Sequence, residues 1–217
     1  MSQWLLIEPV RHQAALAGRA FNAQTKKAIG GVLVTIIKAP EEFTRWLNVK
    51  ALQYGDRWQV MAERPDRTRT AIDGHFHFLD LPDGEYSLTA SLPSAGRRYG
   101  TALVTVTVSR ENNNKNIIAT ADLALPPTTV NGRISDQNGE SVVLAEVRVK
   151  RSTESTFSNR EGQYLLMELE ASVRQERTVL VSAPGYEVAS QKVLLTEAGI
   201  EKTLDFVLKK RNSVSTA

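Results

Sequence analysis

Two histidines, His75 and His77, have a spacing that a small metal site could use. Side chains two residues apart on a β-strand project from the same face, so these imidazoles could offer two nitrogens to one ion. Phe76 and Phe78 alternate with them, and this alternation predicts aromatic rings in the core and histidines in solvent. Asp73, two residues before His75, is the nearest acid that would share the face of the two histidines. Because no further ligand stands nearby, we predict that the pair holds no metal.

Other patterns that carry chemistry are missing from the sequence. The chain has no cysteine, which excludes disulfides, thiolate metal sites and cysteine nucleophiles. It contains no His-x-x-Glu zinc motif and no Gly-x-Ser-x-Gly nucleophile elbow. Ser94 and Ser109 have no base beside them. We therefore predict a protein that is not an enzyme and that has no catalytic residues and no cofactor.

The aromatic residues between positions 43 and 58 are the candidates for binding a partner. They are Phe43, Trp46, Tyr54 and Trp58. Amphipathic aromatic side chains dominate the energetics of interfaces, so a surface built from them could bind a protein or a sugar. The alternative is that they form a small core beneath a long connection. Both interpretations remain open at the level of the sequence.

A short helix and the segment after it would position these aromatics. Pro40, followed by two glutamates, is typical of a helix start, because proline suits the first turn and acids suit the positive end of the helix dipole. Apolar residues then recur with helical spacing, at positions 43, 46, 47, 51 and 54. We predict a strand from Trp58 to Ala62 after the helix. A β-hairpin that turns at Gly55 is the alternative for this stretch.

The rest of the chain has the two-residue periodicity of β-strands. Valines at positions 104, 106 and 108 alternate with threonines, which predicts a strand with one buried and one solvated face. Asn138-Gly139 suits a hairpin that needs positive φ, and Leu81-Pro82-Asp83-Gly84 suits a type I turn. Many short strands at this spacing predict an all-β fold, a sandwich or barrel with Greek-key connections.

The chain also repeats itself. Both halves contain, in the same order, a Gly-Arg pair, an acid-Gly turn that leads into a strand, and an aspartate followed by three apolar residues. These anchors stand at Gly18, Gly74 and Asp122 in the first copy and at Gly132, Gly162 and Asp205 in the second. The interval between the first two anchors is about 26 residues longer in the first copy. The excess locates an insertion at about residues 39–70.

These anchors predict four segments. A lead segment covers residues 1–12, a first β-sandwich covers 13–125, a second covers 126–211, and a flexible tail covers 212–217. Pro126-Pro127 stands between the sandwiches as a stiff joint, because proline cannot continue a β-ladder.

The order of the motifs resembles that of the carboxypeptidase regulatory-like domain, a transthyretin-like (prealbumin-like) β-sandwich. The resemblance rests on Asp73-Gly74-His75-Phe76-His77-Phe78, Leu81-Pro82-Asp83-Gly84-Glu85-Tyr86 and Asp122-Leu123-Ala124-Leu125. The second copy departs from the pattern at residues 170–177, and Ala183-Pro184-Gly185-Tyr186 restores it. The resemblance implies two tandem transthyretin-like Greek-key β-sandwiches. It also implies a role without catalysis, since most members of the family are not enzymes.

The transthyretin fold has one enzyme to consider, the hydrolase that opens hydroxyisourate. The resemblance makes such a hydrolase the third choice of function. Its family pattern includes a C-terminal Tyr-Arg-Gly-Ser and histidines on separate strands. This chain ends differently, and its second copy has no histidine, which disfavours that activity.

Composition excludes several classes of protein. Of the 217 residues, 24% are charged and 41% are hydrophobic, as in ordinary globular domains. The net charge of +3 comes from interleaved basic and acidic residues, which predicts no nucleic-acid partner. The apolar runs are far shorter than the ~20 residues of a bilayer crossing, which predicts no membrane insertion. The N-terminal residues lack the pattern of a signal peptide, so we expect synthesis in the cytoplasm.

Together these observations predict an adaptor or structural subunit that binds protein partners in a larger assembly. Members of the family occur as extensions of phage-tail-like contractile injection machines and secretion spikes. An assembly of this kind would reconcile a usually extracellular module with the expected lack of a signal peptide. A carbohydrate-binding or adhesive surface module is the alternative. The sequence does not indicate an oligomeric state.

Overall fold

The computed structural model describes residues 13–61, 64–109 and 118–211, so the predicted lead and tail segments lie outside the described residues. The chain divides into two compact units. The first contains the residues up to 21 together with 28–90 and 103–123. The second contains 22–27, 91–102 and everything from 124 onward. Two short stretches of the N-terminal half therefore belong to the second unit.

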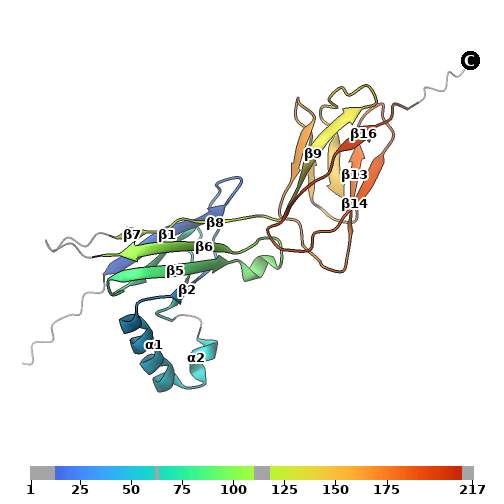
Figure 1. The fold of residues 1–217 in the computed structure, drawn as a ribbon. Helices are drawn as coiled ribbons and strands as arrows, with labels where there is room; N and C mark the ends of the chain where they lie inside the picture. The colour runs from blue at the N-terminus through green and yellow to red at the C-terminus, as the bar shows by residue number, and fades with distance from the viewer. Residues whose placement is uncertain (1–12, 62–63, 110–117, 212–217) are drawn as a thin grey trace, which may run out of the picture. The chain divides into compact units, whose positions relative to one another are not determined.

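The first unit is built from a pair of four-stranded sheets (Figure 1). One sheet has the order β4-β1-β7, with β8 also paired to β1; its strands are β1 (Ala14–Asn22), β4 (His75–Leu79), β7 (Ala119–Thr120) and β8 (Leu123–Leu125). The other has the order β3-β2-β5-β6; its strands are β2 (Leu33–Lys38), β3 (Arg67–Arg69), β5 (Gly84–Ser91) and β6 (Ala102–Val108).

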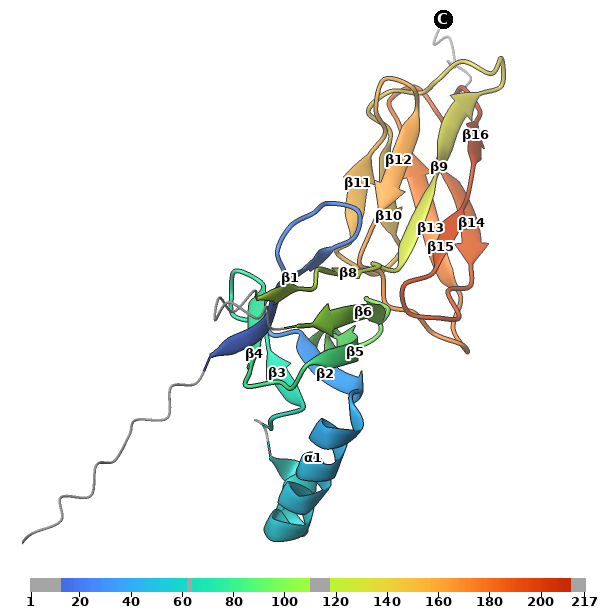
Figure 2. The ribbon, with the colours of Figure 1, turned by 60° about the vertical axis from the view of Figure 1, so that its left-hand side comes forward.

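The second unit has the same strand order (Figure 2). One sheet runs β12-β9-β15, with β16 also paired to β9; its strands are β9 (Thr129–Asp136), β12 (Gln163–Leu166), β15 (Glu201–Thr203) and β16 (Phe206–Leu208). The other runs β11-β10-β13-β14; its strands are β10 (Glu146–Val149), β11 (Ser155–Phe157), β13 (Arg177–Ser182) and β14 (Ala189–Val193). Strand β1 thus corresponds to β9, β2 to β10, and so on to β8 and β16.

Helices occupy only short parts of the chain. Helices α1 (Glu41–Tyr54) and α2 (Arg57–Val60) lie between β2 and β3, and a 3-10 helix, η1 (Pro93–Ala95), lies in the second unit. Both views show α1 extending away from the end of β2 (Figures 1 and 2). The predicted all-β fold with two β-sandwiches and a short helix in the insertion is confirmed. Among the described residues, no helix has the length and apolarity needed to span a membrane.

The Gly-Arg anchor of each copy lies where three strands meet. Strand β1 pairs antiparallel with β4 and parallel with β7, and β9 pairs antiparallel with β12 and parallel with β15 and β16. The last strand of each unit is interrupted beside the glycine. A Cβ on Gly18 would overlap the carbonyl of Ala121, and one on Gly132 would overlap that of Leu204. Glycine is required at both positions because the interrupted strand comes this close.

Each core is formed by the inward faces of both sheets. In the second unit, buried side chains come from β9, β12 and β16 on one side and from β10, β13 and β14 on the other. In the first unit, Phe76 and Phe78 of β4 are each 3% exposed, while His75 and His77 face outward. The predicted phase of this strand is therefore confirmed. Tyr86 of β5 is fully buried, and its hydroxyl donates to the carbonyl of Pro82.

Candidate functional site

The insertion of the first unit begins with α1, which starts at the position that the sequence indicated. Pro40 precedes the helix in an extended conformation, and Glu41 and Glu42 occupy its first turn. Acids at this end are favourable because the helix dipole is positive there. Gly55 ends the helix with a φ of 55°, and its N–H donates to the carbonyl of Ala51 at 2.9 Å. A left-handed residue at this position is readily supplied by glycine.

The aromatic side chains of α1 divide between core and surface. Phe43 is 4% exposed and meets the ring of Tyr86 edge-on, with 5.9 Å between ring centroids. Trp46 packs against Phe43 at 5.7 Å but remains 44% exposed. The ammonium of Lys50 lies 5.8 Å from the centroid of the Trp46 ring, a cation–π arrangement. Phe43 therefore packs α1 against the core of the first unit, whereas part of the indole of Trp46 is exposed to solvent.

The second pair of aromatics is organised around Trp58. This side chain is 8% exposed and lies in α2. The guanidinium of Arg64 covers the Trp58 ring at 4.8 Å and binds both carboxylate oxygens of Asp66, at 2.9 and 2.6 Å. Tyr54 stacks on Trp58 with 6.0 Å between centroids, yet it is 47% exposed. A bidentate, largely buried Arg–Asp pair of this kind fixes the geometry of both partners.

The strand predicted from Trp58 to Ala62 is wrong, and so is the alternative hairpin. Residues 57–60 form α2, and Ala62 lies outside the described residues. The N–H of Trp58 donates to the carbonyl of Gly55 at 3.0 Å, and that of Met61 to Arg57 at 3.1 Å. Bulky residues favour a strand only where a neighbouring strand can accept its hydrogen bonds. Here the backbone N–H groups of Trp58 and Met61 donate to carbonyls within the same segment, so no neighbouring strand is needed. The indole of Trp58 is buried beneath Arg64 instead.

A cavity of about 560 Å³ lies beside these aromatics, within the first unit. Phe43, Trp46 and Glu42 of α1 line one side of it. The remaining lining comes from the stretch before and into β3 and from the end of β4 and the turn after it; these residues are Arg64, Pro65, Arg67, Thr68, His77, Phe78, Leu79, Asp80 and Pro82. The volume falls in the range of ~300–1,000 Å³ typical of ligand pockets.

The charged groups around the cavity are not all partnered within the chain. Arg64 is engaged by Asp66, and the carboxylate of Asp80 accepts from the backbone N–H of Gln13 at 3.0 Å. The Nε atom of Arg67, by contrast, is buried and has no hydrogen-bond partner among the described residues. A buried donor without a partner is costly, and such groups often await a ligand, ion or water. The cavity is thus lined by apolar side chains and by an arginine whose Nε atom has no partner within the described part of the chain.

The histidine pair forms no metal cluster. Asp73 accepts the backbone N–H of His75 at 3.1 Å, and its other oxygen lies 3.2 Å from Nδ1 of that imidazole. These interactions with His75 hold the pKa of Asp73 below its usual value. His77 lines the cavity. In residues 13–61, 64–109 and 118–211, no group of three or more potential metal-ligating side chains comes together.

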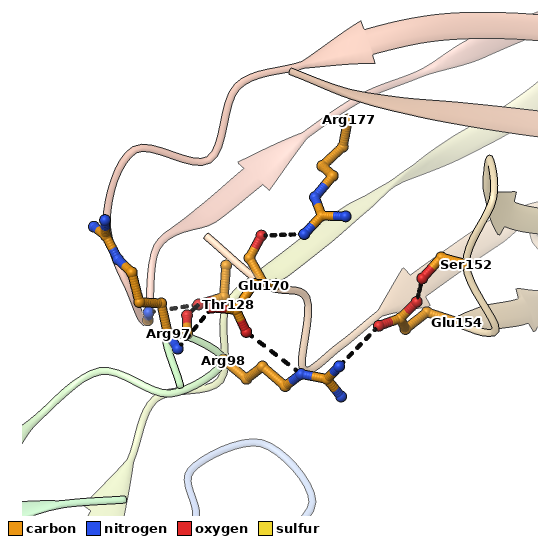
Figure 3. A network of polar contacts seen from close by, with 8 residues as sticks. Arg97, Arg98, Thr128, Ser152, Glu154, Glu170 and Arg177 are labelled. Carbon is orange, nitrogen blue, oxygen red and sulfur yellow. Dashed lines mark hydrogen bonds and ion pairs between the residues drawn. The ribbon is translucent and has the colours of Figure 1, made fainter. Parts of the chain in front are cut away.

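A second concentration of charge lies in the second unit and has a structural character (Figure 3). The carboxylate of Glu170 accepts the backbone N–H of Arg97 at 3.0 Å and lies 3.5 Å from the guanidinium of Arg98. That guanidinium also reaches Glu154 at 3.6 Å, and Arg177 donates to the carbonyl of Glu170 at 3.2 Å. These contacts hold residues 91–102 in the unit.

Tyr99 belongs to the same stretch and is similarly constrained. Its hydroxyl donates to Glu168 at 2.6 Å and accepts from the side-chain amide of Asn22 at 3.1 Å. Burial and the Glu168 carboxylate raise the pKa of Tyr99 to about 12. The phenol therefore keeps its proton at neutral pH and serves as a hydrogen-bond donor.

The structure brings together only part of the predicted site. Phe43 and Trp46 reach the cavity, whereas Tyr54 and Trp58 form a separate stacked pair. Arg67 and Leu79 were not predicted as part of this surface, because they lie on strands β3 and β4, outside the aromatic segment. No local pattern in the sequence signals that these strands face α1.

The fold and these sites define a protein of two β-sandwich units in which the first carries an aromatic insertion. Residues 129–209 match the family model of the carboxypeptidase regulatory-like domain. The match lies within the second unit and agrees with the resemblance seen in the sequence. No curated protein sequence matches the chain.

Several solved structures are similar to the chain at low identity. The shaft pilin SpaA from Lactobacillus rhamnosus GG has 13% identity and a TM-score of 0.42, with 92% of this chain and 97% of that chain covered. The Bacillus anthracis TIE protein has 11% identity and a TM-score of 0.35, with 91% and 34% covered. A Coh3ScaB-XDoc_M1ScaA complex, a type II cohesin-X-dockerin complex from Acetivibrio cellulolyticus, has 16% identity and a TM-score of 0.31, with 38% and 58% covered. Identities and scores at this level do not transfer a function.

Proposed function

We propose that the protein is a non-enzymatic adaptor or structural subunit that binds a partner protein through the insertion of its first unit. The observation that carries the proposal is Trp46, a half-exposed indole at the edge of a cavity with apolar walls. Half-exposed aromatic residues next to a pocket are the usual anchors of protein interfaces. Phe43 and Trp58, which are buried, then support the surface, while Trp46 and Tyr54 touch the partner.

Exposed apolar side chains on the same two helices as Trp46 and Trp58 support a protein partner. Val49 is 53% exposed, Leu52 84% and Val60 82%, all on α1 or α2. Apolar residues gathered on a small helical segment, with charged neighbours such as Arg45, match the apolar centre and polar rim of an interface. These residues contribute little to the sandwich itself, so their exposure is not explained by folding.

The cavity suggests what the partner presents. Phe43, Phe78 and Leu79 offer apolar contacts, and the Nε atom of Arg67 has no partner in the part of the chain that the structure describes. A partner segment with a large apolar side chain next to a carboxylate would fill the space and satisfy the guanidinium. Charge-assisted hydrogen bonds from arginine to carboxylate are among the stronger polar contacts.

A sugar is a weaker candidate for the same surface. Stacking of a sugar ring requires an open aromatic face, and the ammonium of Lys50 lies over the indole of Trp46. Tyr54 has one face against Trp58. A glycan array probed with the full chain separates the two possibilities: specific glycan binding that Trp46→Ala abolishes would replace the protein partner with a carbohydrate.

Photo-crosslinking from the insertion tests the proposal. A photoreactive phenylalanine analogue is placed at position 46 in one chain and at position 157 in another. Phe157 is a matched control because it is aromatic, 60% exposed and on β11 of the second unit. In cells that produce the protein naturally, the partner should be captured from position 46 and not from position 157.

The captured partner is then made recombinantly and its affinity for the chain is measured. Loss of an interface anchor costs at least about 2 kcal/mol, so Trp46→Ala should weaken binding roughly 30-fold or more. Phe157→Ala should leave both the affinity and the melting temperature unchanged. Binding that survives Trp46→Ala, or that is weakened equally by Phe157→Ala, overturns the insertion as the binding surface.

The particular assembly is proposed as a phage-tail-like contractile injection machine or a secretion spike. This form of the proposal rests on the family resemblance. Neighbouring genes for a tail sheath, tube or baseplate, and co-purification with their products, would support it. A captured partner from an unrelated structure would replace the assembly and retain the binding surface.

A further inference from the structure

Strand β6 stands at the edge of the sheet β3-β2-β5-β6 in the first unit. Within the described part of the chain it is hydrogen-bonded to β5 alone. An edge strand presents a row of unpaired backbone N–H and C=O groups, which form a template for another strand. Most proteins protect such edges with charge, proline, a bulge or a very short strand.

Strand β6 has none of the common protections. Its seven residues, Ala-Leu-Val-Thr-Val-Thr-Val, include no charge, no proline and no glycine. Leu103 is 69% exposed, and the valines at positions 104 and 106 are only half-buried. At the other edge of the same sheet, β3 is three residues long and contains two arginines. The contrast marks β6 as the unprotected edge.

The corresponding strand of the second unit is protected. Strand β14 has five residues, and Lys192 on it pairs with Glu176 at 3.1 Å. The side-chain amide of Gln191 donates to the carbonyl of Asp205 at 2.6 Å. The same fold position therefore carries a paired charge in one unit and no charge in the other, where the hydroxyl of Thr105 interacts only with that of Ser87 on β5, at 3.2 Å, within the described part of the chain.

We propose that β6 pairs antiparallel with β6 of a second copy of this chain, around a two-fold axis at Thr105. In this register Thr105 faces its own copy, Val104 faces Val106 and Leu103 faces Thr107. Pairs of β-branched residues across strands are favourable, and the two valine pairs would continue the half-buried edge of the core. A two-fold interface of this kind is self-complementary and closes after two copies.

The lack of charge is the reason to choose a second copy as the occupant. At a two-fold axis between antiparallel strands the central residue lies opposite its own copy, so a charge at that position would face a like charge and destabilise the pair. Thr105, the residue on the proposed axis, is uncharged, as is the rest of β6. A strand supplied by a different protein would gain nothing from an uncharged edge, because its own charges could be complementary. This inference is independent of the insertion and of its proposed partner.

Cysteine crosslinking tests the register directly, because the natural chain has no cysteine. Residues directly opposite on antiparallel strands have Cα atoms about 4.5–5.5 Å apart, within the range of a disulfide. Thr105→Cys should therefore form a covalent dimer of the full chain under mild oxidation. Leu103→Cys alone should not, because the two copies of residue 103 would lie about 14 Å apart. A mixture of Leu103→Cys and Thr107→Cys should crosslink.

A charge exchange provides the second test and does not depend on oxidation. Thr105→Lys and Thr105→Glu should each be monomeric by light scattering, and an equimolar mixture should dimerise. Ser190→Lys on β14 is the matched control and should leave the dimer intact. A wild-type chain that stays monomeric at high concentration overturns the proposal. So does a dimer that survives both single substitutions or crosslinks equally at positions 103 and 105.

Discussion

The two units share one strand order and differ most in a single connection. Between β2 and β3 the first unit has residues 39–66, with two helices, whereas residues 150–154 join β10 to β11 in the second. The second unit shows that the sandwich needs only a short turn there. The longer connection is therefore not required by the strand order, and its exposed aromatic and apolar side chains are consistent with the binding surface proposed above.

The cores of the units differ in a smaller way at the equivalent residues Phe76 and Tyr164. Each lies opposite the glycine that admits the interrupted last strand, Gly18 or Gly132. Phe76 fills its site with an apolar ring. Tyr164 adds a hydroxyl that donates to the carbonyl of Leu204 at 2.6 Å. The same position is thus held by packing alone in one unit and by packing with a hydrogen bond in the other.

The largest expected effect comes from removing the first of these rings. Phe76→Ala should destabilise the first unit by ~3–5 kcal/mol, through lost burial and the cavity left behind. Urea denaturation followed by circular dichroism measures the loss. Tyr164→Ala should produce a comparable loss in the second unit. An unchanged transition for Phe76→Ala would contradict the placement of β4 in the core.

The second prediction isolates the extra hydroxyl of the second unit. Burial and the Asp205 carboxylate raise the pKa of Tyr164, so the phenol keeps its proton for the bond to Leu204. Tyr164→Phe leaves that carbonyl without its partner and should cost about 1–3 kcal/mol. Tyr186→Phe in the same unit is the control and should change stability by less than ~0.5 kcal/mol. Equal effects would mean that the hydrogen bond does not distinguish the two cores.

A third prediction concerns the turn after the first strand of each copy. Asn22 at the end of β1 accepts the N–H groups of Gln24 and Thr25, at 2.9 and 3.0 Å. Asp136 at the end of β9 accepts those of Asn138 and Glu140, at 2.8 and 3.1 Å, and pairs with Lys210 at 3.4 Å. The two turns are similar, but only in the second is the accepting side chain charged.

This charge should make the second turn sensitive to acid. Burial alone would raise the pKa of Asp136, but the N–H groups of Asn138 and Glu140 and the ammonium of Lys210 lower it below its usual 3.8. A lowered pKa stabilises the folded state above pH 4, and this contribution disappears as the carboxylate is protonated at lower pH. The difference in melting temperature between wild type and Asp136→Asn should therefore shrink from pH 7 to pH 3. A constant difference would show that the ion pair contributes nothing.

The smallest effect is expected for the two histidines. The position of His75 is occupied by Gln163 in the second unit, which folds without an imidazole there. Replacing both His75 and His77 with glutamine should change stability by less than ~0.5 kcal/mol, because both side chains face solvent. Stoichiometric zinc in protein purified without a histidine tag would contradict this prediction.

Local patterns were enough to predict much of the fold. The alternation around Phe76 and Phe78 has the period of a strand, and one phase alone buries both rings. The helix start at Pro40 could be predicted because it depends on adjacent residues, whereas Gly55, considered only as the turn of a hairpin, proved to be the residue that ends the helix. The segment after Gly55 was misread, since the strand preference of Trp58 was outweighed by local hydrogen bonds and by the cover from Arg64. The boundaries of the predicted domains and the partner-binding residues stay predictions.

The sequence by itself determined the strand phases, the two Gly-Arg anchors and the presence of an aromatic insertion, because each depends on neighbouring residues and on their period. Tertiary structure alone decided which aromatics are buried, that α1 and the end of β4 enclose a cavity, and that β6 lies at an edge while its neighbours do not. These outcomes depend on contacts between residues far apart in the chain. Periodicity indicates which face of a helix or strand is apolar, but only the packed structure determines which residues that face contacts.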